Sequence, residues 1–167
     1  MSVSQHLGVY AVCRQADQLL CIQKNAGPYA NRFDLPGGSQ QAGEDLVTTL
    51  VREFKEETGH QVISYTNNRV YDTFVHEQGV ADTVHHIFVL FDVQFAAAQS
   101  QLPEQVADGR NDSNGCTWQS LATLSPANSS PLVLRAVAEI QNSTPDYHAS
   151  RFPEWQHLSK GKKRSYD

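Results

Sequence analysis

The chain has 167 residues, of which 40% are hydrophobic and 19% are charged, and its formal net charge at pH 7 is −5. These values are typical of one globular domain with a real core, and the acidic balance argues against stable nucleic-acid binding, which needs a basic surface. Because no apolar run approaches the roughly 18 residues of a membrane span and the N-terminus lacks a signal-peptide pattern, we expect a cytoplasmic protein without membrane contact.

The N-terminal third is predicted to be mostly β-strand. Leu7–Arg14 and Gln18–Lys24 are apolar, strand-like segments joined by a short polar turn, which is the pattern of a hairpin. Arg32–Leu35 reads as a further short strand that enters a Pro-Gly-Gly loop. Three basic residues near these strand ends either reach substrate phosphates or are simply solvated, and the sequence leaves both alternatives open: Arg14, Lys24 and Arg32.

A helix is predicted directly after this loop. The segment from Glu44 to Thr58 contains neither glycine nor proline and is rich in residues that favour helix. Gly59 ends it, since glycine enters the left-handed C-terminal conformation without steric penalty. One sector of the helix is apolar and should pack on a sheet; it consists of Leu46, Val47, Leu50, Val51 and Phe54.

Three carboxylates share one turn of this helix. Glu53, Glu56 and Glu57 are spaced i, i+3 and i+4, and Arg52 lies beside them. Carboxylates this close repel each other, and a hard divalent cation relieves the repulsion, because Mg²⁺ and Mn²⁺ prefer oxygen ligands. The pattern therefore indicates a metal site rather than a plain solvated face.

The spacing of these residues resembles the signature of the Nudix hydrolases. That signature is Gly, five residues, Glu, seven residues, then Arg-Glu-apolar-any-Glu-Glu-any-Gly-apolar. The chain departs from it only at His60, where the family has an aliphatic residue. The matching positions are Gly38, Glu44, Arg52, Glu53, Phe54, Glu56, Glu57 and Gly59.

The resemblance implies metal-dependent hydrolysis of a diphosphate bond in a nucleoside diphosphate derivative, with Mg²⁺ as cofactor and Mn²⁺ as a possible substitute. Glu56 and Glu57 are the implied principal metal ligands. Glu53 is implied as a further metal ligand or as the general base, with Arg52 orienting it. Support for the loop is implied for Gly37, Gly38 and Glu44. An additional acid outside the signature remains possible, and the two candidates are Asp112 and Glu77.

Beyond the helix, strands are expected at Gln61–Thr66, Arg69–Val75 and Thr83–Phe95, and the last is apolar enough for the buried middle of a sheet. His85 and His86 are adjacent in a strand and point to opposite faces, so they do not form a metal pair. One histidine among His76, His85 and His86 is expected to line the substrate pocket. The aromatic side chains expected to hold the base or sugar are Phe33, Tyr71, Phe74 and Trp118, with Arg32 beside them.

The C-terminal part is predicted to contain a strand at Cys116–Gln119 and a helix from Pro131 to about Asn142, with Ser130 as N-cap. This helix should cover the sheet face opposite the first helix. Residues 143–167 are expected to form an irregular extension of a single domain spanning 1–167. Cysteines at irregular spacing are expected to be buried thiols: Cys13, Cys21 and Cys116.

The element order suits an α/β fold, an α/β/α sandwich around a mixed β-sheet, which is also the fold that the resemblance implies. Three functions compete: a nucleoside triphosphate pyrophosphatase, an ADP-ribose or nucleotide-sugar pyrophosphatase, and a catalytically silent sensing or binding module. The intact carboxylates favour an enzyme, and the short chain favours triphosphates. A monomer and a homodimer are both compatible with the sequence.

Overall fold

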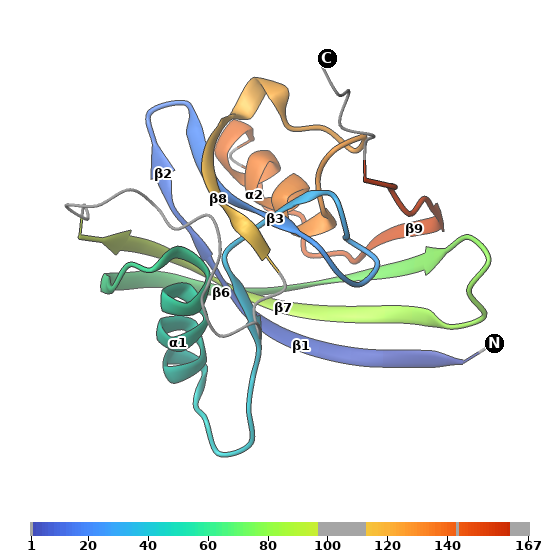
Figure 1. Cartoon of the computed structure of the whole chain (residues 1–167), viewed down its shortest axis with the longest axis horizontal. Helices are drawn as coiled ribbons and strands as arrows, with labels where there is room; N and C mark the ends of the chain where they lie inside the picture. Colours follow the sequence, from blue (N-terminus) through green and yellow to red (C-terminus); the bar gives the residue numbers. More distant parts are fainter. Residues whose placement is uncertain (1, 97–112, 143, 161–167) are drawn as a thin grey trace, which may run out of the picture.

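The computed structural model describes residues 2–96, 113–142 and 144–160. It shows two β-sheets with helices on either side of them (Figure 1). In chain order the elements are β1 (Val3–Val12), β2 (Arg14–Gln15), β3 (Gln18–Lys24), β4 (Phe33–Asp34), β5 (Gly37–Ser39), α1 (Leu46–Thr58), β6 (Val62–Glu77), β7 (Thr83–Phe95), β8 (Ser113–Ser120), the 3-10 turn η1 (Leu121–Thr123), α2 (Pro131–Gln141) and β9 (Ser150–Trp155).

The larger sheet is mixed, as predicted. Its five strands are ordered β5-β1-β7-β6-β9; β1 pairs parallel with β7 and β6 parallel with β9, whereas the other two pairings are antiparallel. The apolar strand β7 lies in the middle, as its composition indicated. The two strands expected around Asn67 are one strand, β6, with an irregular register between Thr66 and Arg69.

The smaller sheet is built around β3. This strand pairs antiparallel with β2 and β4 and with β8, which contains the predicted strand at Cys116–Gln119. The three cysteines are buried free thiols, as expected from their spacing. Among the residues that the structure describes, no helix is long and apolar enough to cross a membrane.

The two helices cover opposite sides of the strands. Helix α1 is capped at its start by Asp45, which accepts a hydrogen bond from the Thr48 N–H, and ends at Gly59 with φ 76°. Its buried Phe54 packs with Val9 and Val89 in one core cluster. Helix α2 starts at the predicted Ser130 cap, and its apolar residues pack in a second cluster: Leu132, Val133, Ala136 and Val137. The predicted placement of α2 opposite α1 is therefore confirmed.

The C-terminal extension is more regular than expected. Ser150–Trp155 forms an edge strand parallel to β6, and Trp155 is buried, with its Nε1–H donating to the carbonyl of Pro28. The expectation of an irregular segment rested partly on Pro153, but proline is compatible with an edge strand, where its missing N–H removes no ladder hydrogen bond. The segment therefore contributes to the core.

Candidate active site

The Gly37–Gly38 strand and helix α1 bring two carboxylates against one loop. Glu57 is buried, and its Oε2 accepts a hydrogen bond of 2.9 Å from the backbone N–H of Gly37. Burial raises the pKa of Glu57 well above its usual value. Burial also raises the pKa of Glu53, which the charge of Arg52 partly offsets. Both carboxyls therefore lie in surroundings that disfavour their negative charge.

Gly38 makes room for Glu53. A Cβ atom at position 38 would lie 2.7 Å from the carboxyl carbon of Glu53, which is too close for any real side chain. Gly37 is more restricted, because its φ is 150° and a Cβ there would lie 2.2 Å from the backbone oxygen of Val9. The two glycines thus have different functions: Gly37 allows the loop conformation, and Gly38 allows the position of a carboxylate.

Arg52 connects the remaining acids. Its Nε and Nη2 donate to both oxygens of Glu44 at 2.7 and 2.8 Å, and its Nη1 donates to Glu53 at 2.9 Å. Longer contacts of 3.3 and 3.4 Å reach Glu56, and Nη2 also donates to the Ser39 carbonyl. The hydrogen bond from Arg52 lowers the pKa of Glu44 to about 2. Glu44 therefore anchors Arg52, which in turn holds Glu53.

We expect Gly38→Ala to lower kcat by on the order of 10², because even a 1 Å displacement of a catalytic group has an effect of this size. The fold should survive, since the clash is with the end of a flexible side chain. Gly37→Ala should instead destabilise the protein, by about 1–3 kcal/mol from backbone strain alone. Steady-state kinetics and thermal unfolding of both variants distinguish the effects. Ser39→Ala is the control, and equal unfolding temperatures for both glycine variants would contradict the assignment.

The donor set fits a hard divalent cation. Three carboxylates share one turn of α1, and burial raises the pKa of two of them, Glu53 and Glu57, so their negative charge is poorly compensated. Within the described ranges, no three acidic, histidine or cysteine side chains are already grouped as a finished metal site. Arg52 holds Glu53 and Glu56, whereas Glu57 is held by the loop. Glu56, whose side chain is 38% exposed, makes only the longer contacts with Arg52, at 3.3 and 3.4 Å.

A cavity of about 250 Å³ lies on the other side of the Gly37 strand. Tyr10, which pairs with Gly37 across β1 and β5, is one of its walls, and Lys24 of β3 is another. The positive charge of Lys24 lowers the pKa of both Glu53 and Glu57, so the lysine lies within electrostatic reach of the carboxylates. The full lining is His6, Tyr10, Lys24, Ala26, Gly27, Pro28, Tyr29, Asp34, Val84 and His86.

His86 is fixed in this cavity by two tyrosines. Its Nε2 lies 3.1 Å from the Tyr10 hydroxyl and its Nδ1 lies 3.0 Å from the Tyr29 hydroxyl. Burial lowers the pKa of His86 to about 3, so the ring is neutral at physiological pH. Of the three histidines expected as candidates for the substrate pocket, His86 is the one that lines this cavity. His85 points to the opposite sheet face, and His76 bonds the Val80 carbonyl in the β6–β7 turn.

Arg32 and Phe33, which were predicted to bind the substrate, do not line this cavity. The guanidinium of Arg32 is buried, donates to the carbonyls of Pro126 and Gln156 and lies 4.0 Å from the centre of the Trp155 ring. Phe33 packs against the α2 core, whereas its neighbour Asp34 lines the cavity. Adjacent residues in a strand point to opposite sides, so only one of the pair can face the site.

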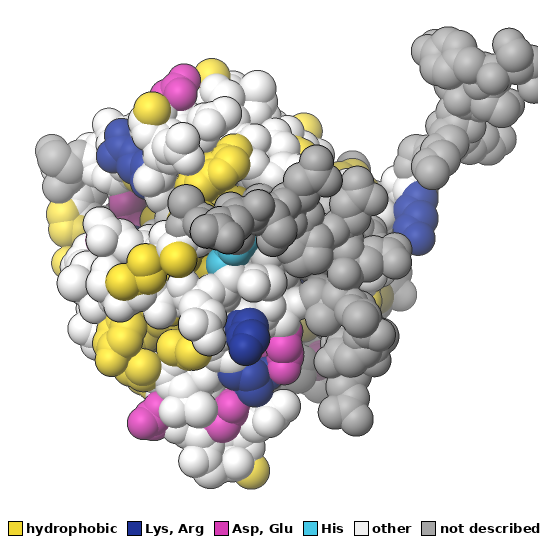
Figure 2. Space-filling view, turned by 60° about the vertical axis from the view of Figure 1, so that its left-hand side comes forward, with side chains coloured by type: hydrophobic (Ala, Val, Ile, Leu, Met, Phe, Trp, Pro, Cys, Tyr) yellow, Lys and Arg dark blue, Asp and Glu magenta, His cyan; other side chains and the backbone are white. Residues whose placement is uncertain are grey.

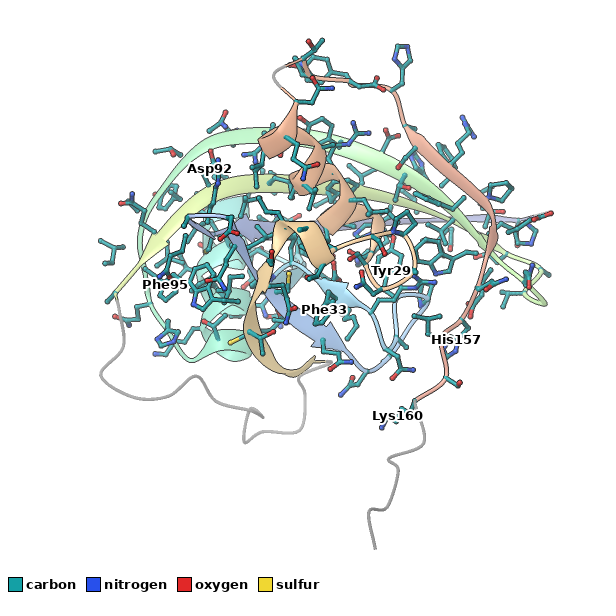
Figure 3. The ribbon with its side chains drawn as sticks, turned by 90° about the horizontal axis from the view of Figure 1, so that it is seen from above. Tyr29, Phe33, Asp92, Phe95, His157 and Lys160 are labelled. Carbon is teal, nitrogen blue, oxygen red and sulfur yellow. The ribbon has the colours of Figure 1, made fainter. Side chains whose placement is uncertain are left out.

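The other three aromatic candidates also lie elsewhere. Tyr71 donates to Glu139 and stacks on Tyr147 beside α2. Phe74 stacks on His85 and lies under the guanidinium of Arg151. Trp118 stacks on Phe95, and Figure 3 shows Phe95 far to one side of the molecule from the cavity residue Tyr29. Sequence composition identified aromatic residues but could not say which sheet face each one occupies.

The extra acids do not join the described site. Glu77 lies at the far end of β6, where the register pairs His76 with Thr83 and Thr83 with Val3. The Gly38 loop instead pairs with Val9, six residues along β1, which places Glu77 about 20 Å away at the usual strand rise. Glu77 is therefore not a base for this site. Asp112, the other candidate, lies outside the described residues.

Comparison with known proteins agrees with this geometry. A profile of the NUDIX domain matches residues 4–138. The chain is 26% identical over 109 residues to the nucleoside triphosphatase NudI of Escherichia coli O139:H28, covering 62% of this chain and 72% of that protein. In structure it is similar to a MutT NUDIX hydrolase from Burkholderia pseudomallei (TM-score 0.61, 20% identity, 82% of this chain and 98% of the other). It is also similar to a MutT protein from Methanosarcina mazei Go1 (TM-score 0.59, 21% identity, 86% and 96%).

Proposed function

Since the chain belongs to the Nudix family of hydrolases, whose members generally depend on a divalent metal and act on nucleotides, we propose that it hydrolyses nucleoside triphosphates to monophosphates. The observation that carries this proposal is the complete set of carboxylates around Arg52, placed beside a cavity that Lys24 also lines. The similarity to a nucleoside triphosphatase supports the choice of substrate. A silent binding module would have no need for the full set.

The metal would be held by Glu53, Glu56 and Glu57. When bound, it supplies positive charge for the phosphate oxygens and lowers the pKa of a coordinated water. These three side chains accept but do not donate hydrogen bonds when ionised, so they cannot balance phosphate charge by themselves. Mg²⁺ is the proposed ion, with Mn²⁺ as a substitute, because both prefer oxygen ligands.

Glu53 is the proposed general base. Its raised pKa brings the carboxylate closer to the range in which a base accepts a proton efficiently near neutral pH. Arg52 fixes one of its oxygens at 2.9 Å, and Glu44 fixes Arg52 through two short hydrogen bonds. Of the three metal-binding acids, Glu53 is therefore the one that Arg52 holds most closely, which fits the additional function of base.

The cavity between the sheets is the proposed nucleoside site. Its walls of tyrosine and histidine rings provide surfaces for a base or sugar, and stacking on such rings contributes about 1–3 kcal/mol per base. Its volume of about 250 Å³ is below the roughly 300–1,000 Å³ of sites for drug-sized ligands. One nucleoside suits this space better than two linked moieties, which favours a triphosphate over ADP-ribose or a nucleotide sugar.

A substrate panel tests this proposal. Equal concentrations of the common ribo- and deoxyribonucleoside triphosphates, ADP-ribose and several nucleotide sugars are incubated with the enzyme and Mg²⁺, and products are separated by ion-exchange chromatography. We expect monophosphate and pyrophosphate from the triphosphates, at kcat/KM at least 10-fold above the other compounds. Faster release of monophosphate from ADP-ribose or a nucleotide sugar would replace the proposed substrate with that class.

Lys24→Gln should lower kcat/KM for a triphosphate about 10-fold, because the charge next to the phosphate path is lost. Removing this charge also raises the pKa of Glu53 and Glu57, which Lys24 normally lowers. The acid limb of the kcat/KM profile should therefore move to higher pH. Lys55→Gln removes an identical charge from the exposed face of α1 and is the matched control. An unchanged pH profile in Lys24→Gln would show that the lysine does not act on these carboxylates.

A further inference from the structure

The loop between β3 and β4 forms one wall of the proposed nucleoside cavity. Residues 26–29 of this loop line the cavity. The hydroxyl of Tyr29 lies 3.0 Å from Nδ1 of His86, which lines the same cavity. We call residues 26–32 the cavity loop. The position of the cavity loop therefore determines the shape of the space in which the nucleoside is proposed to bind.

The C-terminal residues 155–158, which we call the clasp, contact the cavity loop. The Nε1–H of Trp155 donates to the carbonyl of Pro28 at 2.7 Å, and the rings of Trp155 and Tyr29 meet edge-on with their centres 5.9 Å apart. Figure 3 shows His157 of the clasp on the same side of the molecule as Tyr29. Trp155 is 4% exposed and is held in β9, which pairs with β6. A residue fixed in the sheet therefore supports the loop at the cavity wall.

Two further residues join the end of the cavity loop to the clasp. Nη2 of Arg32 donates to the Gln156 carbonyl at 2.8 Å, and the guanidinium lies 4.0 Å from the centre of the Trp155 ring. The side-chain amide of Asn31 donates to the carbonyl of Leu158. Arg32, which the sequence indicated as a substrate-binding residue, instead holds the loop that lines the cavity.

The clasp lies outside the matched NUDIX domain and away from the carboxylates. The matched profile ends at residue 138. Trp155 pairs with Glu77, at the end of β6 that lies about 20 Å from the Gly38 loop at the usual strand rise. In Figure 1, β9 and α1 lie on opposite sides of the molecule, and Figure 2, which brings the α1 side forward, shows acidic and basic side chains next to one another in the lower half of that face. The clasp therefore reaches the cavity loop without touching the acids of α1.

We propose that Trp155 and Arg32 are positioning residues, which hold the cavity loop in the conformation that binds the nucleoside. This inference rests on the proposed function of the cavity as a nucleoside site. A loop that is already held in its bound conformation loses less freedom when the substrate binds, so the affinity is higher. The nucleoside contacts do not change during hydrolysis. Loss of the clasp should therefore raise KM and leave kcat unchanged.

Two variants test the proposal with little change to the core. Trp155→Phe keeps an aromatic ring but removes the N–H that the Pro28 carbonyl accepts. Arg32→Lys keeps the charge but loses the planar group that spans two carbonyls and lies over the indole ring. Each should raise KM for a triphosphate about 2- to 10-fold, which corresponds to the net contribution of one hydrogen bond. Trp118→Phe is the same change at the other tryptophan, which does not line the cavity, and is the matched control.

Hydrogen exchange measures the position of the loop without any substrate. The backbone N–H groups of Ala30, Asn31 and Arg32 donate to carbonyls in the same turn at 2.8–3.1 Å, so their exchange reports on opening of the loop. We expect these amides to exchange about 2- to 10-fold faster in both variants and at the wild-type rate in Trp118→Phe. Amides of β7 that keep their wild-type rates show that a variant is folded, and one folded variant is sufficient for the test.

Unchanged exchange of the cavity loop in a folded variant would overturn the proposal, and so would faster exchange with an unchanged KM. A lower kcat at constant KM would assign the two residues to stability alone and would overturn it as well. Failure of the proposed function is a separate result, because it appears in the substrate panel of the wild type. KM is then measured for the nucleotide class that the panel selects.

Discussion

Glu57→Gln is expected to lower kcat by on the order of 10² or more and, without metal at neutral pH, to stabilise the fold. The loss of rate follows from removing one charge that positions the cation and the substrate, an effect of the size found for other preorganised charges. The gain in stability follows from the burial of Glu57, whose Oε2 accepts a hydrogen bond from the Gly37 N–H. The amide of glutamine accepts the same hydrogen bond without a buried charge.

The sign of the stability effect depends on pH. Burial raises the pKa of Glu57 in the folded state, so between the unfolded and the folded pKa the native protein binds more protons than the unfolded chain. In the metal-free wild type this contribution to stability is fully present below the unfolded pKa and is lost as pH rises through the folded pKa. Glutamine does not titrate, so the variant should keep its stability over that range.

Thermal unfolding in EDTA at several pH values, together with single-substrate kinetics in excess Mg²⁺, measures both effects. Glu154→Gln, which alters an exposed glutamate of the edge strand β9, is the matched control and should change neither. A Glu57→Gln variant that keeps wild-type kcat with an unchanged metal requirement would remove Glu57 from the proposed ligands. A variant less stable than the wild type in EDTA near pH 7 would contradict the role given to burial.

The fold follows from the sequence wherever a local pattern decides it. Asp45, Gly59 and the apolar sector between them define α1, and Ser130 followed by Pro131 defines the start of α2. The uninterrupted apolar residues of β7 placed it correctly in the middle of a sheet. Strand β9 was not predicted, because its sequence lacks a clear alternation of apolar and polar residues. It is stabilised instead by pairing with the distant strand β6 and by the burial of Trp155.

The same distinction applies to the site. The carboxylates lie on one helix, so their spacing alone predicts that they are close together. The cavity beside them is assembled from β1, β3, β7 and the loop before β4, and no local pattern links Tyr10, Tyr29 and His86. The alternation of a strand shows that His85 and His86 point to opposite faces of the sheet. It does not show which face borders the cavity, because this depends on how the second sheet packs. Tyr29 carried no signal in the sequence.

Removal of divalent metal is expected to abolish turnover, because the ionised side chains of Glu53, Glu56 and Glu57 accept but do not donate hydrogen bonds and cannot balance phosphate charge by themselves. Excess EDTA should reduce the rate to background, and Mg²⁺ or Mn²⁺ should restore it. Cation binding stabilises the native state and favours the ionised carboxylates. The rise in unfolding temperature on adding Mg²⁺ should therefore be larger at pH 8 than at pH 5, where protons compete with the metal for Glu53 and Glu57.

Two variants separate this effect from general salt stabilisation. Glu56→Gln and Glu57→Gln should each lose most of the Mg²⁺-dependent rise in unfolding temperature, whereas Glu154→Gln should retain it. A monovalent salt keeps the ionic strength equal in all samples. Glu56 is partly exposed and makes only long contacts with Arg52, so Glu56→Gln should change the stability of the metal-free fold little. Glu57→Gln should instead stabilise it. Full turnover in excess EDTA would show that the carboxylates serve another purpose than holding a metal.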